Sequence, residues 1–129
     1  MFFYAPPAAA SPGLTWVNRG DVSDMDFDQA DLTKDAAWHD LDFSAIVPEG
    51  ATFIQLEIEV RHASAMQLFK VKEKDYVSGY VNHKIHVQAG NVYHSSRIWI
   101  GVNAGRIIEY NAATGEWDRI NITVVAWAL

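Results

Sequence analysis

The side chains in this sequence that could do chemistry are carboxylates, histidines and tyrosines. The chain contains no cysteine, which excludes thiol chemistry. Glu57 and Glu59 stand on one face of an alternating segment, about 7 Å apart, a spacing that a pair of catalytic carboxylates can use. The sequence around them contains no nucleophile elbow, phosphate-binding glycine loop or dinucleotide fingerprint. Such a pair is also typical of any exposed strand. We therefore predict no enzyme activity and no catalytic residue, with a small hydrolase as the least favoured alternative.

An acidic run imitates a calcium-binding loop. Asp24, Asp26 and Asp28 stand at alternate positions, and Asp35 occupies the twelfth position, as in an EF-hand. The position that requires glycine for the sharp turn is Gln29, so an exposed acidic edge is the better interpretation.

The histidines do not form a metal motif either. His83 and His86 are three residues apart on a predicted strand, which directs them to opposite faces. The remaining three are scattered along the chain, at positions 39, 62 and 94. We predict no metal site and no cofactor, and a thermal-shift screen with zinc, nickel and calcium is the experiment that would contradict this.

The best candidate for a binding surface is a mixed aromatic and polar face. Residues 76–88 alternate between apolar and polar positions, and tyrosine rings beside amides and hydroxyls can hold a sugar ring. Tyrosine and tryptophan are equally enriched in subunit interfaces, which is the competing interpretation. The candidate ligand-binding residues are Tyr76, Tyr80, Asn82, His86 and Trp99.

The N-terminal residues 1–13 form a different kind of segment, apolar and interrupted by three prolines. Prolines hold a chain extended, and the rings of Phe2, Phe3 and Tyr4 are costly to leave in water. We expect an extended arm over residues 1–13 whose aromatic tip contacts its own domain or a neighbouring subunit. Residues 14–129 are then a single domain. The segment lacks the basic start of a signal peptide.

Composition limits the function classes. Half of the 129 residues are hydrophobic and 12% are aromatic, which is typical of a chain that packs a core. The 16 acidic residues outnumber the 10 basic ones, giving a net charge of -6, so nucleic acid is not expected as a partner. No apolar run approaches the about 18 residues that cross a membrane, so we expect no membrane insertion.

Alternation with a period of two dominates the rest of the chain, whereas a helical apolar stripe is absent from the sequence. The clearest case is 53–60, where Ile54, Leu56, Ile58 and Val60 share one face. Further strands are expected at 38–43, 66–72, 76–88, 97–102, 107–110 and 119–127. The fold class that follows is all-β, an antiparallel β-sandwich or jelly roll of about eight strands.

The end of the chain has a recognisable pattern. Residues 107–110 and 119–127 are joined by a loop with Asn111 and Gly115, which predicts a closing hairpin and, with 97–102, a three-strand meander. We expect Trp117 and Trp127 to pack in the core.

Residues 38–60 and 106–129 together resemble a group of small uncharacterised β domains found in phage and prophage tail or fibre regions and in related bacterial proteins. The shared pattern is an aromatic and acidic strand, then I-V-P-x-G-A, an alternating apolar strand, and I-E-Y followed by W-x-x-I-N-I-T-V.

The resemblance implies a non-enzymatic structural or adhesion subunit that assembles into a symmetric homo-oligomer, with a trimer as the first expectation from fibres. It implies a virion or extracellular location. A carbohydrate-binding module, with a host surface glycan as partner, is the alternative function.

Overall fold

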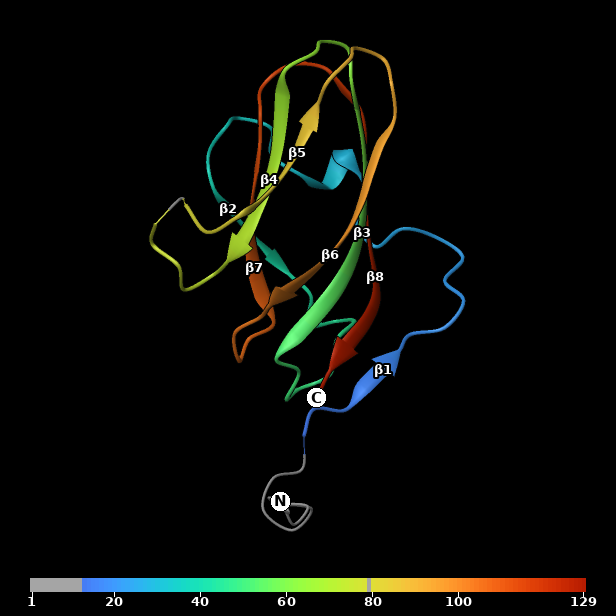
Figure 1. The fold of residues 1–129 in the computed structure, drawn as a ribbon, viewed down its shortest axis with the longest axis vertical. Helices are drawn as coiled ribbons and strands as arrows, with labels where there is room; N and C mark the ends of the chain where they lie inside the picture. Colours follow the sequence, from blue (N-terminus) through green and yellow to red (C-terminus); the bar gives the residue numbers. More distant parts are fainter. Residues whose placement is uncertain (1–12, 79) are drawn as a thin grey trace, which may run out of the picture.

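The computed structural model describes residues 13–78 and 80–129, which form a two-layer sandwich of β-strands (Figure 1). One short 3-10 helix, η1, covers Gln29–Asp31. Each layer contains four strands. The strands are β1 (Trp16–Asn18), β2 (His39–Asp42), β3 (Phe53–His62), β4 (Gln67–Glu73), β5 (His83–Val87), β6 (His94–Gly101), β7 (Ile107–Ala112) and β8 (Trp117–Ala128).

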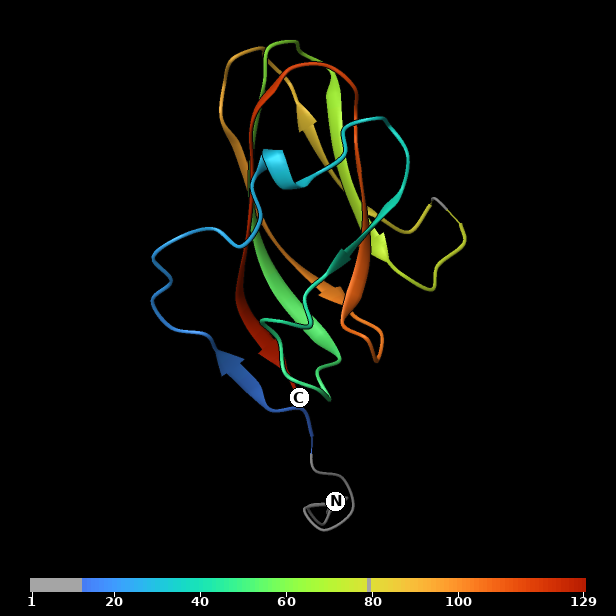
Figure 2. The same cartoon turned by 180° about the vertical axis from the view of Figure 1, so that it is seen from behind.

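The strand order is that of a jelly roll. One sheet has the order β1-β8-β3-β6 and the other β2-β7-β4-β5. The antiparallel pairs β1 with β8, β2 with β7, β3 with β6 and β4 with β5 are nested, as if one long hairpin had been wound into a roll. The predicted all-β sandwich or jelly roll is therefore confirmed, and the two layers lie face to face (Figure 2).

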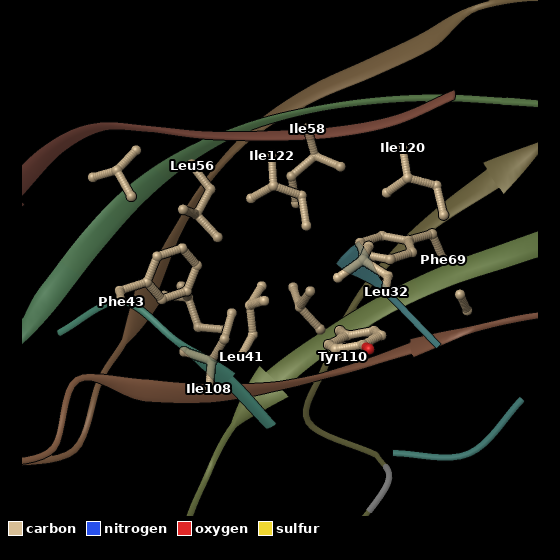
Figure 3. Packing of buried hydrophobic residues seen from close by; sticks show 14 of the residues in the cluster. Leu32, Leu41, Phe43, Leu56, Ile58, Phe69, Ile108, Tyr110, Ile120 and Ile122 are labelled. Carbon is tan, nitrogen blue, oxygen red and sulfur yellow. The ribbon is translucent and has the colours of Figure 1, made fainter. Parts of the chain in front are cut away.

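The core lies between the layers and is built by strand alternation. On β3, Ile54, Leu56, Ile58 and Val60 are fully buried, while the residues between them reach the outer face. Ile120, Ile122 and Val124 of β8 are buried on the same inner side of that sheet. Figure 3 shows Leu56, Ile58, Ile120 and Ile122 on one side of the core and Phe69, Ile108 and Tyr110 from the opposite sheet on the other. Branched aliphatic side chains fill the inner face because they fit a pleated surface closely.

Two irregularities in the pairing of β3 with β8 explain how Trp117 and Trp127 reach the interior. The register shifts between Gln55 and Leu56 and again between Arg61 and His62. Each shift adds one residue to β8, which reverses the direction of the following side chains. Trp127 then pairs with Ile54 and Trp117 with His62, so both indoles pack against the core as predicted.

The structure contradicts three of the predicted local arrangements. The strands at 97–102, 107–110 and 119–127 do not form a meander or a closing hairpin, because β6 and β8 belong to one sheet and β7 to the other. The predicted strand 76–88 is wrong over 76–82, since β5 covers only His83–Val87. Strand β1 was missed, because three residues are too few to show alternation.

Two other predictions concern the chain as a whole. Phe2, Phe3 and Tyr4 lie outside the described residues, so the extended arm over 1–13 stays a prediction. Over the described residues, the structure has no helix long and apolar enough to cross a membrane.

The buried face of β3 should dominate stability. Replacing Ile58 with alanine is expected to lower the free energy of unfolding by about 2 to 5 kcal/mol, because a fully buried side chain leaves a cavity. Replacing Thr123 with alanine also removes a branched side chain, but Thr123 lies on the outer face of the same sheet. This change should lower the free energy of unfolding by about 1 kcal/mol or less. Urea unfolding of both variants checks the difference, and equal losses would contradict the assignment of the inner face.

Candidate functional site

The structure divides the five predicted ligand-binding residues among three places. Tyr76, Tyr80 and Asn82 lie together beside the connection between β4 and β5. His86 is on β5 and borders a separate depression with Met66. Trp99 lies on the other sheet, where it pairs with Trp16. The predicted single platform is therefore wrong, because β5 begins only at His83. Tyr76, Tyr80 and Asn82 thus do not share a strand face with His86.

The first three residues line a hollow of about 310 Å³, which we call the loop hollow. Its wall is completed by Glu73 from the end of β4 and by Ile100 from β6, so both sheets contribute to it. Tyr80 is 94% exposed and presents nearly its whole ring to solvent. The combination of a carboxylate, phenols, an amide and an aliphatic side chain is typical of sites for small polar ligands.

A glycine on the opposite sheet makes room for the Glu73 carboxylate. A Cβ atom at Gly101 would lie only 2.6 Å from Glu73 Oε1, so no larger residue fits without displacing the carboxylate. Glu73 has the same strand parity as the buried residues Phe69 and Val71, which directs it between the sheets. Within the described part of the chain, no ion pair to Glu73 occurs. The carboxylate is thus held at the mouth of the sandwich with acceptor capacity to spare.

The base of the loop is anchored by Lys72. Its buried ammonium group donates a hydrogen bond to the carbonyl of Tyr76, lies 3.4 Å from the carboxylate of Glu109, and is 5.0 Å from the centre of the Trp38 ring. Lys74 is paired with Asp40 at 2.6 Å. Both lysines therefore pair with carboxylates of the protein. The local charge of the hollow is then set by the carboxylate of Glu73.

Glu73 controls the acidity of its neighbour. The pKa of the Tyr76 phenol is raised above its ordinary value of 10.0, first by the negative charge of Glu73 and then by the hydrogen bond to that carboxylate. A nearby carboxylate disfavours the phenolate, so the phenol keeps its proton to higher pH.

Replacing Glu73 with glutamine should therefore lower the pKa of Tyr76 toward 10.0, since the amide removes the charge. Nuclear magnetic resonance of ring-labelled tyrosine, with Tyr76→Phe to assign the signal, measures this titration. An unchanged or higher Tyr76 pKa in Glu73→Gln would contradict the geometry of this pair.

A second surface, which we call the aromatic patch, lies on the outer face of the β1-β8-β3-β6 sheet and comprises Trp16, Phe53 and Trp99. These residues are 58%, 41% and 40% exposed. The rings of Trp16 and Trp99 have centroids 4.7 Å apart and are tilted by 60°. The patch is extended at its margin by Leu14, which is exposed and stands two residues before Trp16.

The small residues of β8 allow this patch to form. Trp16 and Trp99 come from the two edge strands of the sheet, about 14 Å apart across three strand spacings. Two alanines of β8 lie between them in the register. Ala128 pairs with Trp16, and Ala126 pairs with Gln55 of β3, which in turn pairs with Trp99 of β6. Because alanine occupies little space, the two indoles can extend over β8 and β3 until they meet.

The remainder of the same outer face is a ladder of ion pairs between strands. Arg97 binds Glu57 and Arg119 binds Glu59, both at 2.7 Å, and Arg61 lies 3.5 Å from Asp118. Glu57 and Glu59 also border a shallow hollow of about 490 Å³. Each of these carboxylates is engaged by an arginine, so the geometry favours a charge-paired surface over a catalytic pair.

The acidic run between β1 and η1 stabilises the fold locally. Asp26 accepts hydrogen bonds from both terminal nitrogens of Arg19, at 2.6 and 3.0 Å, and from the backbone N–H of Val124 at 2.8 Å. Asp28 caps η1 by accepting from the backbone N–H of Ala30. These contacts fix the segment against β8. The structure describes no group of three or more histidine, aspartate or glutamate side chains that could hold a metal ion within 13–78 and 80–129.

Removing the Asp26 carboxylate should destabilise the domain. Asp26→Ala leaves the Arg19 guanidinium and the Val124 N–H without their acceptor, which we expect to cost about 2 to 3 kcal/mol of unfolding free energy. The Asp24→Ala variant removes an exposed carboxylate from the same run and should cost about 0.5 kcal/mol or less. Thermal and urea unfolding compare the two, and an Asp26→Ala protein as stable as Asp24→Ala would refute this role.

The histidines serve different purposes. His62 is buried against the edge of Trp117, and its Nδ1 accepts a hydrogen bond from the Ser64 N–H, which leaves Nε2 to donate to the carbonyl of Thr114 at 3.2 Å. His39 lies 2.8 Å from Asp35 and lowers the pKa of that carboxyl, mainly through their hydrogen bond. These contacts could not be predicted from the sequence, because the partners of both histidines lie in loops.

Comparison with known proteins gives a likeness in fold. No protein-family model matches the chain, and no curated protein sequence matches it. Among solved structures, the coat protein of tobacco streak virus is similar, with 15% sequence identity and a TM-score of 0.43. The alignment covers 89% of this chain and 84% of the coat protein. A similarity this distant assigns neither a family nor a role to this chain. The resemblance to phage and prophage tail or fibre domains stays a prediction.

Proposed function

We propose that this domain is a non-enzymatic structural subunit that associates with copies of itself through the outer face of its β1-β8-β3-β6 sheet. The observation that carries the proposal is the aromatic patch, in which Trp16, Phe53 and Trp99 are each at least 40% exposed. Burying a large apolar side chain is worth about 1.5 to 3 kcal/mol relative to leaving it in water. Adjacent exposed rings of this kind are typical of surfaces that a partner covers.

Charge pairing on the outer face permits a second copy as that partner. The chain as a whole carries a net charge of -6, which opposes association between copies. On the outer face, however, Arg97, Arg119 and Arg61 each pair with a carboxylate of the same sheet. Two such faces can approach without the repulsion that the rest of the surface would produce.

The N-terminal segment adds to this surface in the proposed assembly. Residues 1–13 lead directly into Leu14 and Trp16 at the margin of the aromatic patch. An arm that carries Phe2, Phe3 and Tyr4 from there would add apolar contact area to a neighbouring subunit. Closed symmetry is the usual outcome of self-association, and the resemblance to fibres favours a trimer. A virion or extracellular location, associated with a phage or prophage, follows from the same resemblance.

Light scattering coupled to size-exclusion chromatography tests the assembly. The parent protein is expected to elute at a multiple of 14.4 kDa. Trp16→Ala and Trp99→Ala should each weaken association at least about tenfold, or about 1.4 kcal/mol, and deletion of residues 1–13 should weaken it further. Tyr80→Ala is the matched control, since it removes an exposed ring outside the patch.

A parent protein that is monomeric at micromolar concentration, and unchanged by the deletion, would refute the proposal. Equal weakening by Tyr80→Ala would also count against it, because the association would then not depend on the aromatic patch.

Carbohydrate binding is a second candidate function, and the loop hollow favours it. Tyr76, Tyr80 and Asn82 of the predicted set gather there around the Glu73 carboxylate, which supplies an acceptor for hydroxyl groups. A structural subunit can also bind a host surface glycan, so the two functions are compatible.

A further inference from the structure

We propose that the loop hollow binds a neutral saccharide through two adjacent hydroxyl groups that donate to the carboxylate of Glu73. The proposal rests on the second candidate function and names its polar anchor and its ligand class. Glu73 was not among the residues that the sequence suggested. Its role depends on a glycine of the opposite sheet, which sequence spacing does not connect to it.

The position of the Glu73 carboxylate is specific. It lies over Gly101, where a Cβ atom would come within 2.6 Å of Oε1, so the absence of a side chain there leaves the space that the carboxylate occupies. A carboxylate has about four lone-pair sites, and Tyr76 uses one of them. Both residues line the hollow, so a ligand bound there lies within reach of the carboxylate. Two hydroxyls on neighbouring ring carbons match the spacing of two carboxylate oxygens, and bonds to an ionised acceptor are the stronger kind.

The charges around the hollow select a neutral ligand. Lys72 lines the hollow, yet its ammonium group is held by the Tyr76 carbonyl and by Glu109. Among the described residues that line the hollow, no lysine or arginine is left to receive a carboxylate or sulfate of an acidic glycan, and Glu73 repels both. A neutral saccharide avoids this repulsion and can still donate hydroxyl groups to Glu73.

The rest of the hollow suits the less polar parts of a sugar. Tyr80, with its ring exposed, offers a surface on which the C–H face of a pyranose can stack. Val81 and Ile100 add aliphatic contacts beside it, and Asn82 adds an amide. The hollow, at about 310 Å³, is at the small end of the range for ligand pockets, which fits one or two sugar rings.

An array of neutral oligosaccharides ending in galactose, glucose or mannose, together with their sialylated counterparts, tests the ligand class on the full chain. We expect binding to neutral members and at least tenfold weaker signals for the sialylated ones. The neutral oligosaccharide with the strongest signal is then titrated calorimetrically into the variants. Glu73→Gln and Tyr80→Ala should each weaken its binding at least tenfold.

Three further variants separate the effect of the Glu73 anchor from general effects. Gly101→Ala displaces the carboxylate end of a flexible side chain, so it should weaken binding at least fivefold while the urea midpoint stays near that of the parent. Glu116→Gln removes an exposed carboxylate from the loop before β8 and should bind like the parent. Trp99→Ala should also bind like the parent, because Trp99 lies on the aromatic patch.

The outcomes separate carbohydrate binding in general from binding at Glu73. An array without any signal would overturn carbohydrate binding as a function and this site with it. Binding that survives Glu73→Gln, or that prefers sialylated members, would overturn the Glu73 site while leaving carbohydrate binding in place. Loss of binding in Trp99→Ala alone would move the site to the aromatic patch and equally refute the proposal.

Discussion

The pairing of β3 with β8 is the constraint on which the rest of the structure depends. Ten residues of β3 pair with β8, from Phe53 opposite Ala128 to His62 opposite Trp117. This central ladder carries most of one inner face of the core and places β1 and β6 on its two sides. Because alternate side chains of a strand must point to opposite faces, the buried aliphatic residues also determine what the outer face presents. A core and an exposed surface thus follow from the same two strands.

The two candidate surfaces arise from different parts of this arrangement. The aromatic patch forms where alanines of β8 leave space above the sheet, so that indoles from both edges meet. The loop hollow forms at an end of the sandwich, where Glu73 of one sheet projects toward Gly101 of the other. In both cases a small residue creates the room that a larger functional side chain occupies. The two surfaces adjoin at β6, which contributes Trp99 to the aromatic patch and Ile100 to the loop hollow.

Sequence patterns predicted the parts of the fold that depend on local alternation. The strands at 38–43, 53–60 and 66–72 match β2, β3 and β4 closely, because their apolar positions follow a period of two. Patterns did not predict which strands become neighbours. The loop between β7 and β8 has the composition of a hairpin turn, yet the nested pairing sends those strands to different sheets. That choice depends on long-range packing, which a local turn signal does not contain.

The candidate site was partly visible in the sequence for the same reason. Tyr76, Tyr80 and Asn82 were identified from their residue types, although the strand on which they were placed does not extend that far. Glu73 and Trp16 were missed because each gains its role from a partner across the fold, Gly101 and Trp99 respectively. Footprinting with hydroxyl radicals at increasing protein concentration is the most direct test of self-association through the aromatic patch. Trp16 and Trp99 should become protected while Tyr80 stays reactive, and unchanged reactivity of both tryptophans would contradict association through this surface.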